Sequence, residues 1–599
     1  MTASAALPRR ADLDSNTTWN IEALFASPQL WDAEYASVAA ALPRLATFWG
    51  KLQSPDEVAA FFRVHDDLAS RVARLGNYAA MSASVDAADA VAAARRDRAS
   101  SLSGDFAAAS AFAEPELLAL PPGTLQAWAA TPELAASAHF FDNLERSRPH
   151  VRSAEVEELL GLARAPFASA RSIHPTLVNS DLDLGEVNGI KIGHGNLDRL
   201  LASEDRETRR RAWEAYADAH LSVQHTLAAC LATGVRQDVF AARARRYGSS
   251  LEAALAPNNL PTEVFHALID TFKKHLPTWH RYYRVRARWL GLKKLREYDV
   301  KAPLTDNPPQ VPYAQAVSWI ARGMAPLGDE YVAALQGGLT TGRWVDISPN
   351  EGKRQGAYST GSRGTAPYIF MSYADSLFSL STLAHEVGHS MHSQLTWQTQ
   401  PWAYSRYSLF VAEVASNFNQ AMVRQHLFAT QTDPDFQIAL IEEALSNFHR
   451  YFFVMPTLAR FELEIHERIE RGEALTAQGL NDLMADLLAE AYGDAVDVDR
   501  ARGGVTWAQF STHLYSNFYV WQYATGIAAA HALLARFETE PDKARDDYLA
   551  LLRAGGSLYP LDALARAGVD MRGGAAVERT FEMLAGYVDR LEELLAARG

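Results

Sequence analysis

Cysteine is nearly absent from this chain, because Cys230 is the only one among 599 residues. A single thiol excludes an intrachain disulfide, a cysteine-based zinc ribbon and an iron–sulfur centre. The sequence also lacks an uncharged apolar run of about 18 residues, which is the length that a membrane span needs. Its first 19 residues contain no apolar core of the kind found in signal peptides. These absences predict a cytoplasmic protein that does not bind membranes.

An excess of positive charge is missing as well. The chain has 57 Lys and Arg against 71 Asp and Glu, a net charge of −14, which argues against a nucleic-acid partner because phosphate contacts need a basic face. Hydrophobic residues make up 48% and charged residues 21%, as in soluble globular proteins. No Gly-rich dinucleotide fingerprint, P-loop Gly-Lys-Ser/Thr or Gly-x-Ser-x-Gly motif is present. Dinucleotide enzymes, P-loop ATPases and serine hydrolases are therefore disfavoured.

Most of the sequence predicts helices. Residues 31–140 are rich in Ala and Leu with apolar residues at helical spacing. Residues 173–197 break this pattern, and Asn188-Gly189 between two alternating runs predicts a β-hairpin. Residues 335–373, rich in Gly, Ser and Thr, predict a small β-element. We expect two domains: residues 1–195, a helical lobe that ends in the hairpin, and residues 196–599, which carry the motifs described next.

The most informative motif is His385-Glu386-Val387-Gly388-His389, within a segment of helical character. Positions i and i+4 of a helix share one face, so both imidazoles can reach one metal ion. Glu386 lies about 100° further round the helix and can contact a water on that metal. The spacing predicts a His-Glu-x-x-His zinc site in which Glu386 is the general base. The alternative is a pair of histidines with a purely structural role.

A catalytic zinc needs a third protein ligand and one open position. Glu413 is the one acid in the amphipathic segment 405–428 and is surrounded by apolar residues, where an unpaired carboxylate would be costly to bury. Ligation of the metal by Glu413 removes that cost; an ion pair with Arg406 is the alternative. Two imidazoles, one carboxylate and a catalytic water are typical of zinc, and we expect one Zn²⁺ per chain.

Donors for the oxyanion and the substrate are expected late in the chain, in residues 506–526. His513 stands there with Tyr515, Tyr519 and Tyr523, and the three tyrosines would share one face of a continuous helix. Phenol and imidazole groups are suitable donors to a developing oxyanion. The alternative is that these tyrosines form an aromatic core stripe.

A substrate-binding element is predicted just before the motif helix. Residues 352–373 carry several glycines and end in a β-prone run, so their backbone could pair with an extended peptide. We expect the contacts to come from Gly356, Ala357, Tyr358 and Tyr368. The alternative is a hairpin that only connects two elements and never touches a ligand.

Several of these segments together resemble the oligoendopeptidase F family of thimet-oligopeptidase-like zinc metallopeptidases. They are GKRQGAYSTGSRGTAPYIFMSY, STLAHEVGHSMHS, FVAEVASNFNQ and HLYSNFYVWQYATG, and the resemblance covers roughly residues 170–580. It implies a mainly α fold, a two-lobed helical body with a deep central channel and a small β-element next to the active-site helix. It also implies an endopeptidase that hydrolyses short unfolded peptides.

By this resemblance, the zinc ligands are His385, His389 and Glu413, Glu386 is the base, and His513 and Tyr519 assist at the oxyanion and substrate. Two departures stand out: residues 379–382 contain no acid to orient His385, and Ser372 stands where relatives often have Asn. A helical metallocarboxypeptidase is one rival interpretation. A metal-binding or peptide-binding protein without activity is another, but it would gain nothing from Glu386. The sequence leaves open whether the protein is a monomer or a homodimer.

Overall fold

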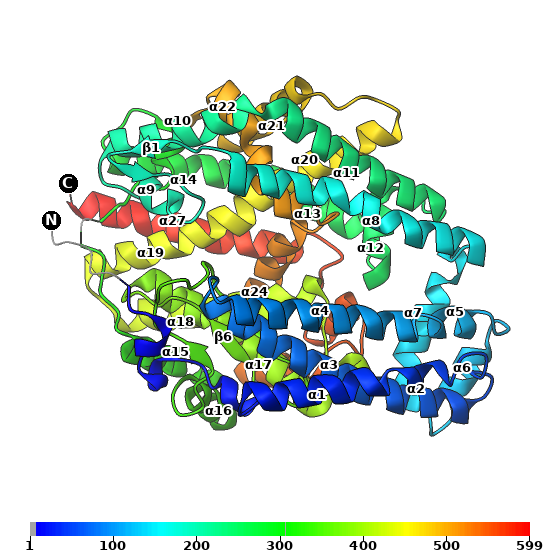
Figure 1. The fold of residues 1–599 in the computed structure, drawn as a ribbon. Coiled ribbons are helices and arrows are strands. Elements are labelled where there is room, and N and C mark those ends of the chain that lie inside the picture. Colours follow the sequence, from blue (N-terminus) through cyan, green and yellow to red (C-terminus); the bar gives the residue numbers. More distant parts are fainter. Residues whose placement is uncertain (1–6, 306, 599) are drawn as a thin grey trace. The chain divides into compact units, whose positions relative to one another are not determined.

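The computed structural model describes residues 7–305 and 307–598, and nearly all of its regular structure is helical (Figure 1). The expected mainly α class is therefore confirmed. The chain divides into two compact units. Unit 1 comprises residues 1–148, 310–426 and 536–568, and unit 2 comprises residues 149–309, 427–535 and 569–599. This division does not coincide with the boundary expected at residue 195, because each unit is assembled from three separate segments.

Unit 1 begins with the Ala-rich helices that the composition predicts. Ser27 and Ser54 accept backbone N–H groups at two helix N-termini, and a proline follows each serine at the first helical position. The long helices α3 and α4 run side by side (Figure 1). The helices of this segment are α1 (Pro28–Ala41), α2 (Pro43–Ala46), α3 (Pro55–Val85), α4 (Ala90–Ser110), α5 (Ala113–Leu118), α6 (Thr124–Ala129) and α7 (Ala138–Ser147).

The rest of unit 1 contains the predicted β-element and the helix with the His-Glu-x-x-His motif. The sheet has the order β4-β6-β5, with β4 parallel and β5 antiparallel to the central strand β6. The motif helix α17 contacts β5, β6 and α25. The elements are α15 (Tyr313–Gly323), α16 (Asp329–Leu339), β4 (Val345–Asp346), β5 (Tyr358–Thr360), β6 (Tyr368–Phe370), α17 (Leu377–Thr399), most of α18 (Leu409–Thr430), α25 (Pro541–Ala554) and α26 (Pro560–Arg566).

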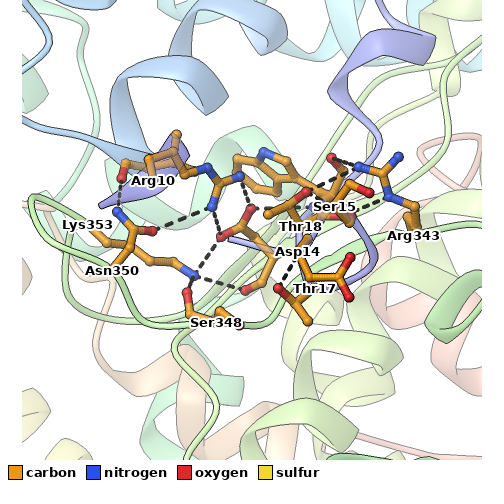
Figure 2. Close-up of polar contacts among 12 residues, drawn as sticks. Arg10, Asp14, Ser15, Thr17, Thr18, Arg343, Ser348, Asn350 and Lys353 are labelled. Atoms are coloured by element: carbon orange, nitrogen blue, oxygen red, sulfur yellow. Dashed lines mark hydrogen bonds and ion pairs between the residues drawn. The ribbon is translucent and has the colours of Figure 1, made fainter. Parts of the chain in front are cut away.

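The N-terminal segment of unit 1 is fixed to this sheet by a buried ion cluster (Figure 2). Asp346, at the end of β4, is fully buried and pairs with both Arg10 and Lys353, whose Nζ lies 2.6 Å from the carboxylate. Trp19 packs its ring against Tyr368 and Phe370 of the central strand. Residues from the start of the chain therefore contact the sheet that adjoins the motif helix. Arg10 pairs with the end of β4, and Trp19 packs against β6.

Unit 2 contains the predicted hairpin, in which β1 (Glu186–Val187) pairs with β2 (Ile190–Lys191) across Asn188-Gly189. Both turn residues have positive φ, of 54° and 77°, as a type I′ turn requires. The other elements are α8 (Ala154–Thr176), α9 (Leu197–Leu201), α10 (Arg206–Ser222), α11 (Gln224–Ala244), α12 (Ser250–Leu255), α13 (Thr262–Lys274), α14 (Leu276–Trp289), β3 (Leu295–Arg296), α19 (Pro434–His449), α20 (Met455–Glu470), α21 (Ala477–Tyr492), β7 (Val496–Asp497), α22 (Arg500–Gly504), α23 (Ser511–Leu514), α24 (Trp521–Thr539, which continues into unit 1) and α27 (Ala575–Arg598).

Across the described ranges, no helix combines the length and the apolar character that crossing a membrane requires.

Candidate metal centre and substrate-binding residues

Three side chains converge in unit 1 as the sequence predicts. Nε2 of His385 lies 3.2 Å from Nε2 of His389, and Oε2 of Glu413 lies 3.4 Å and 3.9 Å from these two nitrogens. Ligand atoms around a tetrahedral Zn²⁺ are separated by about 3.3 Å, given metal–ligand distances of about 2.0–2.1 Å. Among the described residues, this is the only group of three or more His, Cys, Asp and Glu side chains that lie close enough to hold one metal ion.

The glycine of the motif explains how the ligand helices come so close. A Cβ on Gly388 would lie 2.5 Å from the carbonyl oxygen of Ala415 and 2.6 Å from Cα of Ser416. Any larger residue would push α18 away from α17. Gly388 is therefore needed for helix packing, which brings Glu413 to the face that carries both histidines.

Helix α18 also orients both imidazoles. Nδ1 of His385 lies 3.0 Å from Oε1 of Gln420, and the amide nitrogen of Gln420 donates to Ser381 at 2.7 Å. His389 is hydrogen-bonded to the backbone of Ala412. Because each imidazole has such a bond, its Nε2, which faces the other ligand atoms, is available to bind a metal ion. Burial lowers the pKa of His389 to about 4, so this imidazole is neutral at pH 7 and ready to ligate.

The Glu413 carboxylate is fixed by its own helix. Ser416 donates its hydroxyl to Oε2 of Glu413 at 3.1 Å, and Asn417 donates to the Glu413 carbonyl at 2.8 Å. Glu413 is half-buried and, within the part of the chain that the structure describes, forms no ion pair with Arg406. The alternative of a structural ion pair is therefore not what the structure shows.

Glu386 lies beside this group in an enclosed position, with 6% of its surface exposed. Burial raises its pKa to about 7 in the metal-free chain, while His385 and a backbone hydrogen bond from Ser359 act in the opposite direction. The Ser359 hydroxyl also lies 2.8 Å from that of Ser390, one turn beyond Glu386. The edge strand β5 thus positions the carboxylate of the expected base.

The four predicted substrate-binding residues differ in their place in the sheet and in their burial. Gly356 and Ala357 lead into the edge strand β5, and Tyr358 stacks on Phe370 while its hydroxyl donates to Ser84. Tyr368 is in the central strand and only 1% exposed, so its side chain belongs to the core. Of the four predicted residues, Gly356 and Ala357 are the two that remain candidates, because they are not buried and their backbone could pair with a peptide.

The predicted donors lie in unit 2, where the structure groups three of the four. The ring of His513 has its centroid 6.2 Å and 6.0 Å from those of Tyr519 and Tyr523, whose hydroxyls are 2.6 Å apart. Burial, with a smaller effect from Arg450, lowers the pKa of His513 to about 4, which leaves it neutral at pH 7. We call these three residues the His/Tyr cluster.

Tyr515 is not part of the His/Tyr cluster. Its hydroxyl lies 3.3 Å from Nδ1 of His174, and its ring is 4% exposed and packs beside Gly234. The expected continuous helix through residues 515, 519 and 523 is wrong, because α23 ends at Leu514 and α24 begins at Trp521. Phe518 has a φ of 49° in this break, which turns Tyr515 and Tyr519 to different surroundings.

Sequence reasoning missed two residues of the centre, Gln420 and Ser359. Gln420 is seven residues after Glu413, two helical turns along the same face, so helical periodicity could have identified it. Ser359 acts through its backbone, which no side-chain pattern indicates.

Two imidazoles and a carboxylate that converge beside a buried glutamate, in a nearly all-helical chain, match the His-Glu-x-x-His pattern that zinc metallopeptidases use. Residues 199–583 match the model of Peptidase family M3, and residues 116–183 match the model of Oligopeptidase F. The chain belongs to peptidase family M3 and, within it, to the oligoendopeptidase F group.

Known relatives support this assignment over nearly the full length. The chain is 36% identical to oligopeptidase PepF of Bacillus subtilis over 98% of its own length and 89% of the relative. It is 34% identical to the group B oligopeptidase PepB of Streptococcus agalactiae over 98% of both chains. The crystal structure of oligoendopeptidase-F from Enterococcus faecium matches with a TM-score of 0.74 at 29% identity, over 95% of this chain and 99% of that one. The protein is a metalloendopeptidase that hydrolyses peptides.

Proposed function

We propose that the protein is a zinc-dependent oligoendopeptidase that cleaves internal bonds of short unfolded peptides. The convergence of His385, His389 and Glu413 at tetrahedral spacing carries this proposal. The donor set supports zinc, because two imidazoles and one carboxylate leave a position open for water. The names of the relatives, oligopeptidase and oligoendopeptidase, support short peptides as substrates.

The zinc ion, when bound, supplies Lewis acidity that polarises the scissile carbonyl and acidifies a water molecule. Glu386 takes the proton of the attacking water and returns it to the leaving amine nitrogen. Its burial and the backbone hydrogen bond from Ser359 hold the carboxylate in one orientation for both transfers.

The His/Tyr cluster supplies neutral donors for the substrate. His513 and Tyr519 offer N–H and O–H groups to a peptide carbonyl oxygen, and Tyr523 orients Tyr519 through their 2.6 Å contact. The edge strand β5, with Gly356 and Ala357 before it, offers backbone groups to an extended peptide. Such backbone pairing would tolerate many side chains.

The test is an internally quenched peptide blocked at both ends, with about ten residues and an extended length of roughly 33–36 Å. We expect the zinc-loaded enzyme to cleave it, the chelated enzyme to be inactive, and stoichiometric Zn²⁺ to restore cleavage. A metallocarboxypeptidase would cleave only the unblocked form. Cleavage that survives complete removal of the metal would contradict the proposal.

A further inference from the structure

The turn that carries Tyr519 has an unusual backbone. Phe518, directly before it, has a φ of 49°, in the left-handed region that bulky residues rarely adopt. Phe518 is also 1% exposed, and its ring packs 4.7 Å from that of His466 and 5.9 Å from that of Phe265, measured between centroids. A buried aromatic residue keeps such a conformation only where its surroundings enforce it.

A buried carboxyl group is hydrogen-bonded to this turn. Glu462, on α20, accepts the backbone N–H of Phe518 at 2.6 Å through Oε1. Glu462 is 0% exposed, and its Oε2 has no hydrogen-bond partner among the described residues. His466, one turn along the same helix, lies near it and approaches Asp238 at 3.5 Å.

Burying the carboxyl group of Glu462 lowers the stability of the fold. Burial raises the pKa of Glu462 to about 8, because a carboxylate loses its hydration there and gains only one hydrogen bond. An apolar side chain of similar volume would remove that cost, but it would leave the buried N–H of Phe518 without an acceptor. The contacts that this acid makes, a hydrogen bond to the turn and a charge interaction with His466, therefore indicate that it is present to hold the turn and not to fill space.

We propose that Glu462 is a positioning residue for Tyr519. By holding the N–H of Phe518 it fixes the left-handed turn, and the turn places the Tyr519 hydroxyl against that of Tyr523 and beside His513. This inference rests on the proposed function, because it takes Tyr519 as a residue that binds substrate.

The decisive experiment is a double-mutant cycle of Glu462→Met and Tyr519→Phe in the zinc-loaded full chain. We expect each single variant to lower kcat/KM at least tenfold with full zinc content, and Glu462→Met to cost less than twofold more in the Tyr519→Phe background. Hydrogen exchange over residues 515–520 should be faster in both variants that carry Glu462→Met and unchanged in Tyr519→Phe. Glu297→Met is the matched control, since Glu297 also accepts a backbone N–H, from Asp499, far along the chain. It should keep wild-type kcat/KM.

The outcomes separate this inference from the proposed function. Equal losses from Glu462→Met in both backgrounds, or none, would overturn the positioning role. Wild-type kinetics for Tyr519→Phe would overturn the substrate role of Tyr519, and this inference with it, while the zinc site would stand. If Glu462→Met does not fold, Glu462→Gln serves instead. Its amide oxygen still accepts the Phe518 N–H, so kcat/KM within threefold of wild type supports the proposal, and a loss as large as that of Tyr519→Phe contradicts it.

Discussion

Gln420 accepts a hydrogen bond from Nδ1 of His385 over 3.0 Å and so orients the imidazole for which residues 379–382 offer no acid. Residues 379–382 supply no carboxylate, but Ser381 contributes by accepting from the Gln420 amide. A neutral amide therefore fixes the tautomer of this imidazole from the ligand helix α18. It does so without adding negative charge to a centre that already has Glu386 and Glu413.

We expect Gln420→Met to weaken zinc binding by about 10-fold to 100-fold, because the imidazole of His385 loses the partner that orients it. Gln420→Glu keeps an acceptor at the same position and should bind zinc at least as tightly as the wild type. Competition with a chelator of known affinity measures both. Equal zinc affinity in Gln420→Met and the wild type would show that the bond has no role in ligation.

Glu386→Gln should lower kcat by at least about 10³-fold, since the amide cannot accept the proton of water. Zinc content should stay at one per chain, because the ligand atoms are unchanged. Elemental analysis and cleavage of the blocked peptide provide the two measurements. Turnover near that of the wild type would exclude Glu386 as the base.

The pH dependence of kcat/KM should show an acid limb that belongs to Glu386. Burial raises its pKa to about 7 in the metal-free chain, and a nearby cation lowers it, so the limb should lie at or below pH 7. Only the deprotonated carboxylate accepts a proton, so activity rises with pH through this limb. His513, with a pKa of about 4, adds no limb between pH 5 and 8. A His513→Gln variant should keep the limb while losing activity; a limb that disappears in this variant would reassign it to His513.

Glu413→Ala should remove zinc binding at micromolar metal and abolish cleavage, because two imidazoles leave the site short of a ligand. Glu330→Ala, an exposed acid on α16 of the same unit, is the control and should change neither property. Full zinc occupancy of Glu413→Ala after dialysis would require a different third ligand.

The parts of the fold and the site that periodicity governs could be predicted from the sequence. The i, i+4 spacing placed His385 and His389 on one face, and Asn188-Gly189 specified the turn of the hairpin, because both depend on local geometry. The apolar surroundings of Glu413 marked it as the candidate third ligand, because an unpaired carboxylate is costly to bury. Contacts between residues far apart in the chain could not be predicted from the sequence. The helix expected through Tyr515 and Tyr519 is interrupted at a turn whose Phe518 donates its N–H to Glu462, 56 residues away in the chain.

The packing of Gly388 against α18 provides the last prediction. Gly388→Ala would put a Cβ 2.5 Å from the carbonyl oxygen of Ala415, on backbone that cannot rotate away, so the helices must separate. We expect the free energy of unfolding to fall by about 1–3 kcal/mol, as for overpacked cores, and zinc affinity to fall with it because Glu413 moves off the two histidines. Gly337→Ala on α16 is the matched control: its Cβ meets no atom within 4 Å, so the change should stabilise the helix by about 0.5–1 kcal/mol. Thermal unfolding of the metal-free and zinc-loaded forms separates the two effects. If Gly388→Ala binds zinc as tightly as the wild type, the close approach of α17 and α18 serves the stability of the fold and not the geometry of the metal centre.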